Sequence, residues 1–222
     1  MRDASSPEIA APPAVDLKAA RRAALLVLGY LPLLHVLLVA ACAALLPVTG
    51  AMRALLALAS LYLMPPLAAR LGARLVPLPR GRVDLDDPGF LAWWLSAQWQ
   101  VVFNRLPALE EALRLVPGAY SAWLRLWGSR VGALVYWSPG VVVLDRGLVE
   151  VGDRVVFGAG VRINSHALLT RNGRGCLVVA PIRIGRGAMV GGHSLLTPGV
   201  EIAEGAASPP FRLVKVVGAA RG

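Results

Sequence analysis

A six-residue period runs through the C-terminal part of the chain, over residues 131–202. Within it, an aliphatic or aromatic residue returns at every sixth position in three successive runs. These runs are Val131, Trp137, Val143 and Val149, then Val151, Phe157, Ile163 and Leu169, then Ile184, Val190, Leu196 and Ile202. A second small or branched residue follows most of them after four positions, so each hexad is expected to point two side chains inward. This spacing fits neither an amphipathic helix nor an alternating strand, and it predicts a parallel β-helix over residues 129–222.

The chain is too apolar for a purely water-soluble protein, because its mean hydropathy is +0.61 and 56% of its residues are hydrophobic. Residues 23–46 contain one strongly polar side chain, His35, and follow a polar tail at residues 1–20. At about 1.5 Å per residue, this stretch is long enough to cross a hydrocarbon core about 30 Å thick. We expect a transmembrane helix here rather than a cleaved signal, whose apolar run would be shorter and closer to the start.

A second apolar run, residues 54–69, is marginal in length and is broken by Pro65 and Pro66, which remove backbone donors and bend a helix. Two interpretations stay open: a kinked membrane crossing that continues beyond the run, and a re-entrant hairpin. The sequence therefore predicts two membrane-spanning or re-entrant helices within residues 21–80.

Basic residues flank the two apolar runs, and Arg53 alone lies in the joint between them. The flanking residues are Arg2, Lys18, Arg21, Arg22, Arg70, Arg74, Arg80 and Arg82. The positive-inside rule then predicts an integral membrane protein whose termini and β-helix domain are cytoplasmic. The net charge of +10 is better explained by contact with anionic lipid than by nucleic acid, since no nucleic-acid module is visible. Two distant cysteines, Cys42 and Cys176, imply no disulfide.

Five of the six tryptophans fall within residues 87–128. Pro107 and the pair Pro117-Gly118 divide this region into short helices. Tryptophan rings favour the lipid headgroup zone, so residues 81–128 are predicted to form interfacial helices that lay the following domain against the bilayer. Plain packing between helices is the alternative, and we expect a mixture of the two.

The repeat region has few candidate catalytic side chains, and its two histidines are His166 and His193. If Ile163 points inward, the tripeptide Asn164-Ser165-His166 lies at a turn, and the imidazole projects outward. Residues 170–183 then interrupt the period before it resumes at Ile184. An insertion beside a histidine can form a pocket on the otherwise regular surface of a β-helix.

The hexads resemble those of the hexapeptide-repeat acyltransferases. Residues 196–206, Leu-Thr-Pro-Gly-Val-Glu-Ile-Ala-Glu-Gly-Ala, are similar to a common segment of that family. Ser165-His166, followed by a loop and then by residues 182–185, Ile-Arg-Ile-Gly, also resembles its membrane-linked branch, which occurs in peptide-synthetase tails. The likeness covers about residues 120–222. It implies an α+β chain in which transmembrane helices precede a short left-handed parallel β-helix, an exception to the usual right-handed crossover.

The resemblance implies transfer of an acyl group, acetyl or another short one, from acyl-CoA or an acyl-carrier thioester to a hydroxyl or amine. His166 would act as the base, and amides near Gly191 and Gly192 would stabilise the oxyanion. No metal is implied. Four basic residues are candidates for binding the phosphates of coenzyme A, with a solvated basic face as the alternative. They are Arg183, Arg186, Arg212 and Lys215.

The chain departs from the family where an acidic residue often follows the histidine. The acceptor that orients His166 is then expected to be Asp145 or Asp153 on a neighbouring coil, a backbone carbonyl, or a group of another subunit. Asn164 and Ser165 are candidate pocket residues. His193 is either a contact for the pantetheine arm or an ordinary turn residue. The C-terminal end is also short, as if a coil were missing.

Two other classes of function fit parts of the pattern. A zinc carbonic anhydrase on the same rod needs three histidine ligands, and this domain has two. A non-catalytic membrane scaffold with a degenerate repeat domain fits the short end and the missing acid. The family usually forms homotrimers, but helices could instead cap a monomer.

Overall fold

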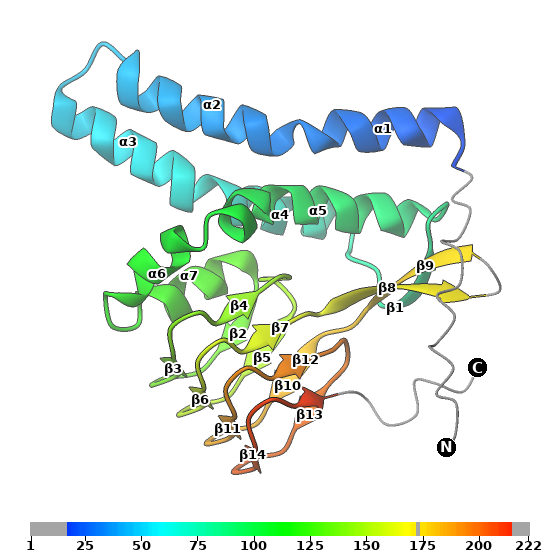
Figure 1. Ribbon diagram of the computed structural model, residues 1–222. Coiled ribbons are helices and arrows are strands. Elements are labelled where there is room, and N and C mark those ends of the chain that lie inside the picture. Colours follow the sequence, from blue (N-terminus) through cyan, green and yellow to red (C-terminus); the bar gives the residue numbers. More distant parts are fainter. Residues whose placement is uncertain (1–16, 172–173, 215–222) are drawn as a thin grey trace, which may run out of the picture.

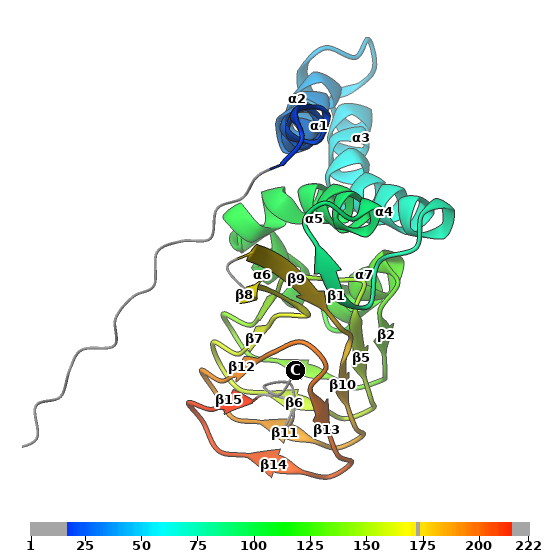
Figure 2. The same cartoon turned by 90° about the vertical axis from the view of Figure 1, so that its right-hand side faces the viewer.

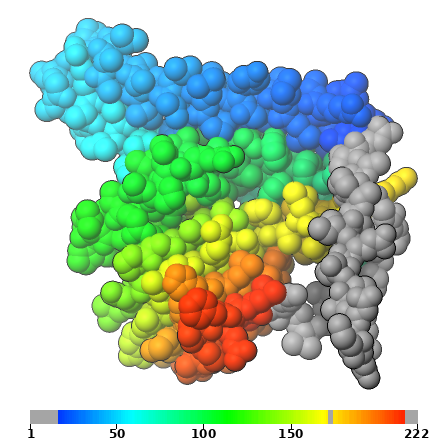
Figure 3. All heavy atoms as spheres, viewed as in Figure 1, coloured from blue at the N-terminus to red at the C-terminus, as the bar shows by residue number. Residues whose placement is uncertain are grey.

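The computed structural model describes residues 17–171 and 174–214. A layer of helices lies across one end of a stack of short β-strand coils, and the last coil is at the far end (Figure 1). In the space-filling view, the helical layer lies directly on the stack of coils (Figure 3).

The C-terminal stack is a parallel β-helix, as the six-residue period predicts. Three four-stranded parallel sheets form its sides, in the orders β13-β10-β5-β2, β14-β11-β6-β3 and β15-β12-β7-β4. The strands are β2 (Arg130–Val131), β3 (Tyr136–Trp137), β4 (Val142–Val143), β5 (Val149–Val151), β6 (Val156–Phe157), β7 (Arg162–Ile163), β10 (Ile182–Ile184), β11 (Met189–Val190), β12 (Leu195–Leu196), β13 (Glu201–Ile202), β14 (Ala207–Ser208) and β15 (Leu213–Val214). Each turn of the chain adds one strand to each sheet.

The periodic residues fill the interior of the stack. Val143, Phe157 and Leu196 are fully buried, and Val131 lies beside Val151 in register. Burial of each such side chain stabilises the fold by about 1.5–3 kcal/mol. Leu169 is the exception, because half of its surface is exposed. Its inward orientation was a wrong prediction: it lies on a hairpin outside the coils.

That hairpin consists of β8 (His166–Arg171) and β9 (Arg174–Val179), which pair in antiparallel fashion. A further strand, β1 (Gly81–Asp84), pairs with β9. The three strands lie between the helical layer and the coils (Figure 2). The insertion therefore begins at His166 itself, as the first residue of a strand, and not at residue 170 as the period suggested.

Four N-terminal helices carry the apolar runs: α1 (Ala19–Gly29), α2 (Leu31–Ala44), α3 (Gly50–Tyr62) and α4 (Met64–Leu75). Helices α1 and α2 form one nearly continuous helix, and so do α3 and α4. The first breaks at Tyr30, before Pro32, and the second at Leu63, before Pro65 and Pro66, since proline suits the first turn of a helix. By length and composition, the segments Ala19–Ala44 and Gly50–Leu75 are each sufficient to cross a membrane.

Three further helices connect this layer to the coils: α5 (Pro88–Arg105), α6 (Ala108–Arg114) and α7 (Ala119–Trp127). Trp123 and Trp127 are buried in the main core against the first coil, and Trp93 is buried in a second, smaller core. Burial excludes these three rings from the lipid headgroup zone. These three rings serve the packing between helices, and the interfacial role of residues 81–128 stays a prediction.

Candidate functional site

His166 lies where the second coil meets the helical layer. Its Nδ1 is 2.7 Å from Oδ2 of Asp145, which follows β4 on the first coil. The other carboxylate oxygen, Oδ1, accepts a hydrogen bond from Nε1 of Trp93 on α5, at 3.2 Å. The imidazole also packs on the indole of Trp93, with ring centroids 4.7 Å apart. Three elements distant in sequence thus hold one imidazole.

This arrangement defines the tautomer of His166. An ionised carboxylate only accepts hydrogen bonds, so in the neutral imidazole Nδ1 carries the proton and Nε2 keeps its lone pair. Within residues 17–171 and 174–214 no hydrogen bond reaches Nε2, and Nε2 is not one of the buried polar atoms without a partner. About a quarter of the side chain is exposed, at 23%. A reactant can therefore approach the exposed part of this imidazole.

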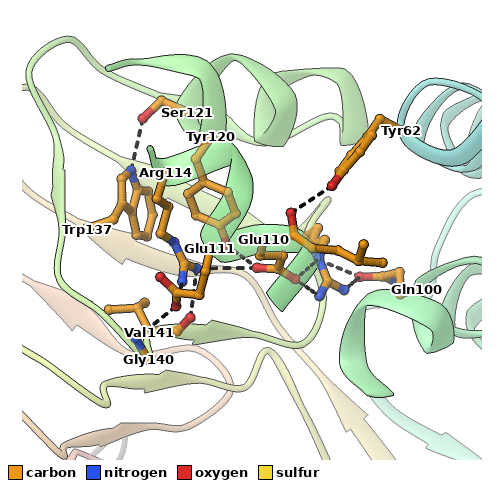
Figure 4. A network of polar contacts seen from close by, with 12 residues as sticks. Tyr62, Gln100, Glu110, Glu111, Arg114, Tyr120, Ser121, Trp137, Gly140 and Val141 are labelled. Carbon is orange, nitrogen blue, oxygen red and sulfur yellow. Dashed lines mark hydrogen bonds and ion pairs between the residues drawn. The ribbon is translucent and has the colours of Figure 1, made fainter. Parts of the chain in front are cut away.

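The residue after Asp145 anchors this corner of the coil. Arg146 is 1% exposed, and its guanidinium pairs with the carboxylate of Glu110 on α6. Its backbone N–H donates to Oε1 of Gln100 on α5, at 2.8 Å. Figure 4 shows Glu110 and Gln100 pointing toward the same place from two helices. A buried, fully paired arginine cannot shift without leaving a charge unpaired, so Asp145 is held rigidly.

Tyr120 on α7 completes the polar cluster. Its hydroxyl donates to Oε2 of Glu110 at 2.6 Å (Figure 4). Burial, followed by the charge of Glu110, raises the pKa of this hydroxyl above its ordinary value. The phenol therefore stays protonated and serves as a permanent donor to Glu110.

Of the two carboxylates proposed as partners of His166, Asp145 is in contact with it and Asp153 is not. Oδ1 of Asp153 accepts from the backbone N–H of Ala133, at 2.7 Å, on another corner of the coils. Ser165 is fully buried, and its hydroxyl donates to the carbonyl of Leu148, so it supports the corner and does not line a pocket.

Asn164 is half-buried beside these residues. Its Oδ1 is buried and has no hydrogen-bond partner among the described residues. An unsatisfied buried acceptor costs free energy, and the burial of this oxygen keeps it away from the surface where a molecule could bind.

Gly191, Gly192 and His193 form a different corner, between β11 and β12. Gly158, which follows β6 one coil earlier, lies directly against Gly192, whereas His166 leaves from the far end of β7. The N–H of Gly191 already donates to the hydroxyl of Ser208. Within one copy of the chain, these glycines therefore do not adjoin His166, and an oxyanion site formed by their amides stays a prediction.

His193 is exposed and adopts φ +55°, and its ring stacks on Phe211 with centroids 5.2 Å apart. His166 and His193 occupy the same position within their hexads. Each coil has three corners, however, so the same position in a hexad can fall at different corners. His193 shares no contact with His166, and its geometry is that of a turn residue.

The candidate phosphate ligands are dispersed. Arg183 lies between Glu150 and Glu201, and the hydrogen bond to Glu201 is the main reason that its pKa is raised. Arg186 lies 3.5 Å from Glu204. Paired with carboxylates, these two guanidinium groups do not form a ready anion site. Arg212 is exposed, and Lys215 lies outside the described residues. In the part of the chain that the structure describes, no three metal-ligating side chains cluster.

No family model matches the chain, and no curated protein matches it. Solved structures do. A hexapeptide-repeat-containing acetyltransferase from Vibrio cholerae is 16% identical over 53% of this chain and 90% of that one, with a TM-score of 0.38. A maltose O-acetyltransferase from Clostridium difficile 630 is 18% identical over 51% of this chain and 80% of its own, with a TM-score of 0.33. A galactoside acetyltransferase, solved in complex with coenzyme A, is 14% identical over 48% and 72%, with a TM-score of 0.31.

Proposed function

We propose that this chain is a membrane-anchored acyltransferase that uses His166 as its general base. The single observation that supports this most is the 2.7 Å contact between Nδ1 of His166 and the buried carboxylate of Asp145. The resemblance of residues 196–206 to the hexapeptide-repeat acyltransferases adds the reaction class. The proposed donor is an acyl-CoA thioester, and the proposed acceptor is a hydroxyl or an amine.

In the proposed reaction, Nε2 of His166 removes the proton from the acceptor O–H or N–H as the acceptor atom bonds to the thioester carbonyl carbon. The carboxylate of Asp145 stabilises the imidazolium that forms. When the tetrahedral intermediate collapses, the C–S bond breaks and the imidazolium returns its proton to the leaving thiolate. The histidine is thus regenerated, and the products are the acylated acceptor and a free thiol.

We also propose left-handed coils and an anchor formed by residues 21–80, with the tail at residues 1–20 and the domain at residues 129–222 in the cytoplasm. The arginines that flank the apolar runs support this orientation. Contacts between the helical layer and the hairpin support a site close to the membrane surface. Leu25 of α1 packs against the same small core as Trp93. In a homotrimer, a neighbouring copy would complete the thioester site.

The experiment is to purify the full chain in detergent and incubate it with a panel of acyl-CoAs of increasing chain length. Thiol release and product mass are measured together. Wild-type protein is expected to transfer an acyl group and release free thiol, whereas His166→Ala is expected to do neither. His193→Ala is the matched control and should retain transfer. If coenzyme A fails to bind the wild-type protein at all, the chain is instead a non-catalytic membrane scaffold.

A further inference from the structure

An apolar cavity of about 310 Å³ lies between α1, α4 and α5. Small residues make room for it: Ala69 and Gly72 on α4, and Ala92 on α5. Larger apolar side chains, among them Leu28 and Leu95, complete the wall. Its size is at the lower end of pockets that bind small organic ligands.

The chemistry of the lining selects the ligand. Hydrocarbon side chains dominate, and Ser96 supplies the one hydroxyl group of the wall. Without charged groups or several hydrogen-bonding groups, such a wall gains free energy only by covering hydrocarbon. The matching ligand portion is an aliphatic chain.

The position of the cavity indicates where that chain comes from. Two of its three walls, α1 and α4, belong to the segments that are long and apolar enough to cross a membrane. Leu71 and Leu75, which flank Gly72 on α4, expose 57% and 75% of their surface. Leu26, close to Leu28 on α1, exposes 66%. Leucines exposed to this degree on both walls favour contact with lipid chains over contact with water, so lipid is the source of chains next to these helices.

The third wall, α5, connects the cavity to His166. Ala92 lines the cavity, and the next residue, Trp93, contacts the imidazole and the carboxylate of Asp145 on another side of the helix. The cavity and the surroundings of His166 therefore share α5 as a common wall.

We infer that the acceptor is a membrane lipid, and that the cavity between α1, α4 and α5 binds its hydrocarbon chain while its hydroxyl or amine head reaches His166. This inference rests on the proposed acyl transfer and adds the class of acceptor. Lipid binding can be measured without turnover, so the two ideas can fail separately.

The test uses a monoacylglycerol with a photoreactive diazirine in its chain, mixed with the full chain in detergent micelles. Crosslinked peptides are expected to map to residues 68–76 and 88–99. Gly72→Leu fills the cavity: a Cβ at Gly72 meets no atom within 4 Å, so the change fits the backbone. It is expected to reduce crosslinking at these peptides by about tenfold. Gly29→Leu is the matched control, because its Cβ is equally unobstructed and Gly29 does not line the cavity.

Transfer to the monoacylglycerol and to free glycerol is compared in the same proteins. Gly72→Leu should lower transfer to the lipid and leave transfer to glycerol unchanged. Crosslinks spread evenly over α2 and α3, or equal loss with both acceptors, would overturn the inference. His166→Ala should keep normal crosslinking and lose transfer. If it retains transfer, the proposed function fails while the lipid site stands.

Discussion

The carboxylate of Asp145 lies 2.7 Å from Nδ1 of His166, although 21 residues and a full coil separate them in the chain. Asp145 in turn accepts a hydrogen bond from Trp93, and Arg146 beside it is fixed by Gln100 and Glu110. The imidazole is thus oriented by groups that the helical layer and the first coil supply together. Each element of this arrangement makes a separate prediction.

Replacing Asp145 with Asn should reduce kcat by about 10²-fold or more, because the amide can hold the wrong tautomer of His166 and cannot stabilise the imidazolium. Initial rates of thiol release from acyl-CoA measure this effect. Asp153→Asn is the control and should behave as wild type, since Asp153 binds a backbone N–H on another corner. An equal fall of kcat in both variants would show that Asp145 does not orient the imidazole of His166.

Trp93 is a positioning residue, and Trp93→Phe should remove its hydrogen bond to Asp145 while retaining most of the ring packing. We expect kcat to fall by about tenfold, the loss expected for about 1.4 kcal/mol, while KM changes little. The pH–rate profile should also shift, which a purely structural defect would not cause. Trp94→Phe is matched to it, since Nε1 of Trp94 donates to the carbonyl of Leu25 instead. An unchanged profile in Trp93→Phe would argue against the positioning role.

Glu110→Gln should destabilise the fold by about 3–5 kcal/mol, because Arg146 is left as an uncompensated buried charge. The measurement is the thermal unfolding midpoint in detergent. Glu111 pairs with Arg114 nearby, but its side chain is 39% exposed. Glu111→Gln should therefore cost less than about 1 kcal/mol. Similar midpoints for the two variants would contradict the importance of the buried pair.

Tyr120 should make stability fall at alkaline pH. Its pKa is raised in the folded protein above the ordinary value of 10.0, so the unfolded chain loses this proton first as pH rises. The contribution is fully present below that value and is lost above it. Tyr120→Phe should flatten this part of the stability curve, measured by unfolding midpoints on either side of pH 10.0. A curve as steep as that of wild type would mean that other groups dominate.

The β-helix could be predicted from the sequence because its signal is local. Residues such as Phe157 and Val190 recur with the period that a flat-sided coil demands, and both are fully buried. Helix breaks were partly visible, as at Pro65 and Pro66, but the break before Pro32 was missed inside a long apolar run. Strand β1 was also missed, because its four residues gain stability only by pairing with β9.

The site was less predictable because its contacts are long-range. One available signal was overlooked. Val131 pairs with Val151 and Val143 with Ile163, so equivalent positions on the first two coils are 20 residues apart. That spacing places Asp145 level with Ser165, directly before His166. No comparable pattern indicates Trp93, since its position depends on how α5 packs on the hairpin. A hexad also does not identify its corner, so the period alone could not show that Gly191 and Gly192 lie at a different corner from His166.

Acyl transfer by purified His166→Ala, compared with His193→Ala at equal folded protein and saturating acyl-CoA, tests most directly whether His166 is the base. Transfer is expected to fall by about 10²-fold or more in the first variant and to stay at the wild-type rate in the second. His193→Ala should unfold within a few degrees of the wild-type temperature, because its imidazole is exposed. His166→Ala leaves the buried carboxylate of Asp145 without its imidazole partner, so the rates are compared per folded protein. Wild-type transfer by His166→Ala would contradict the central claim.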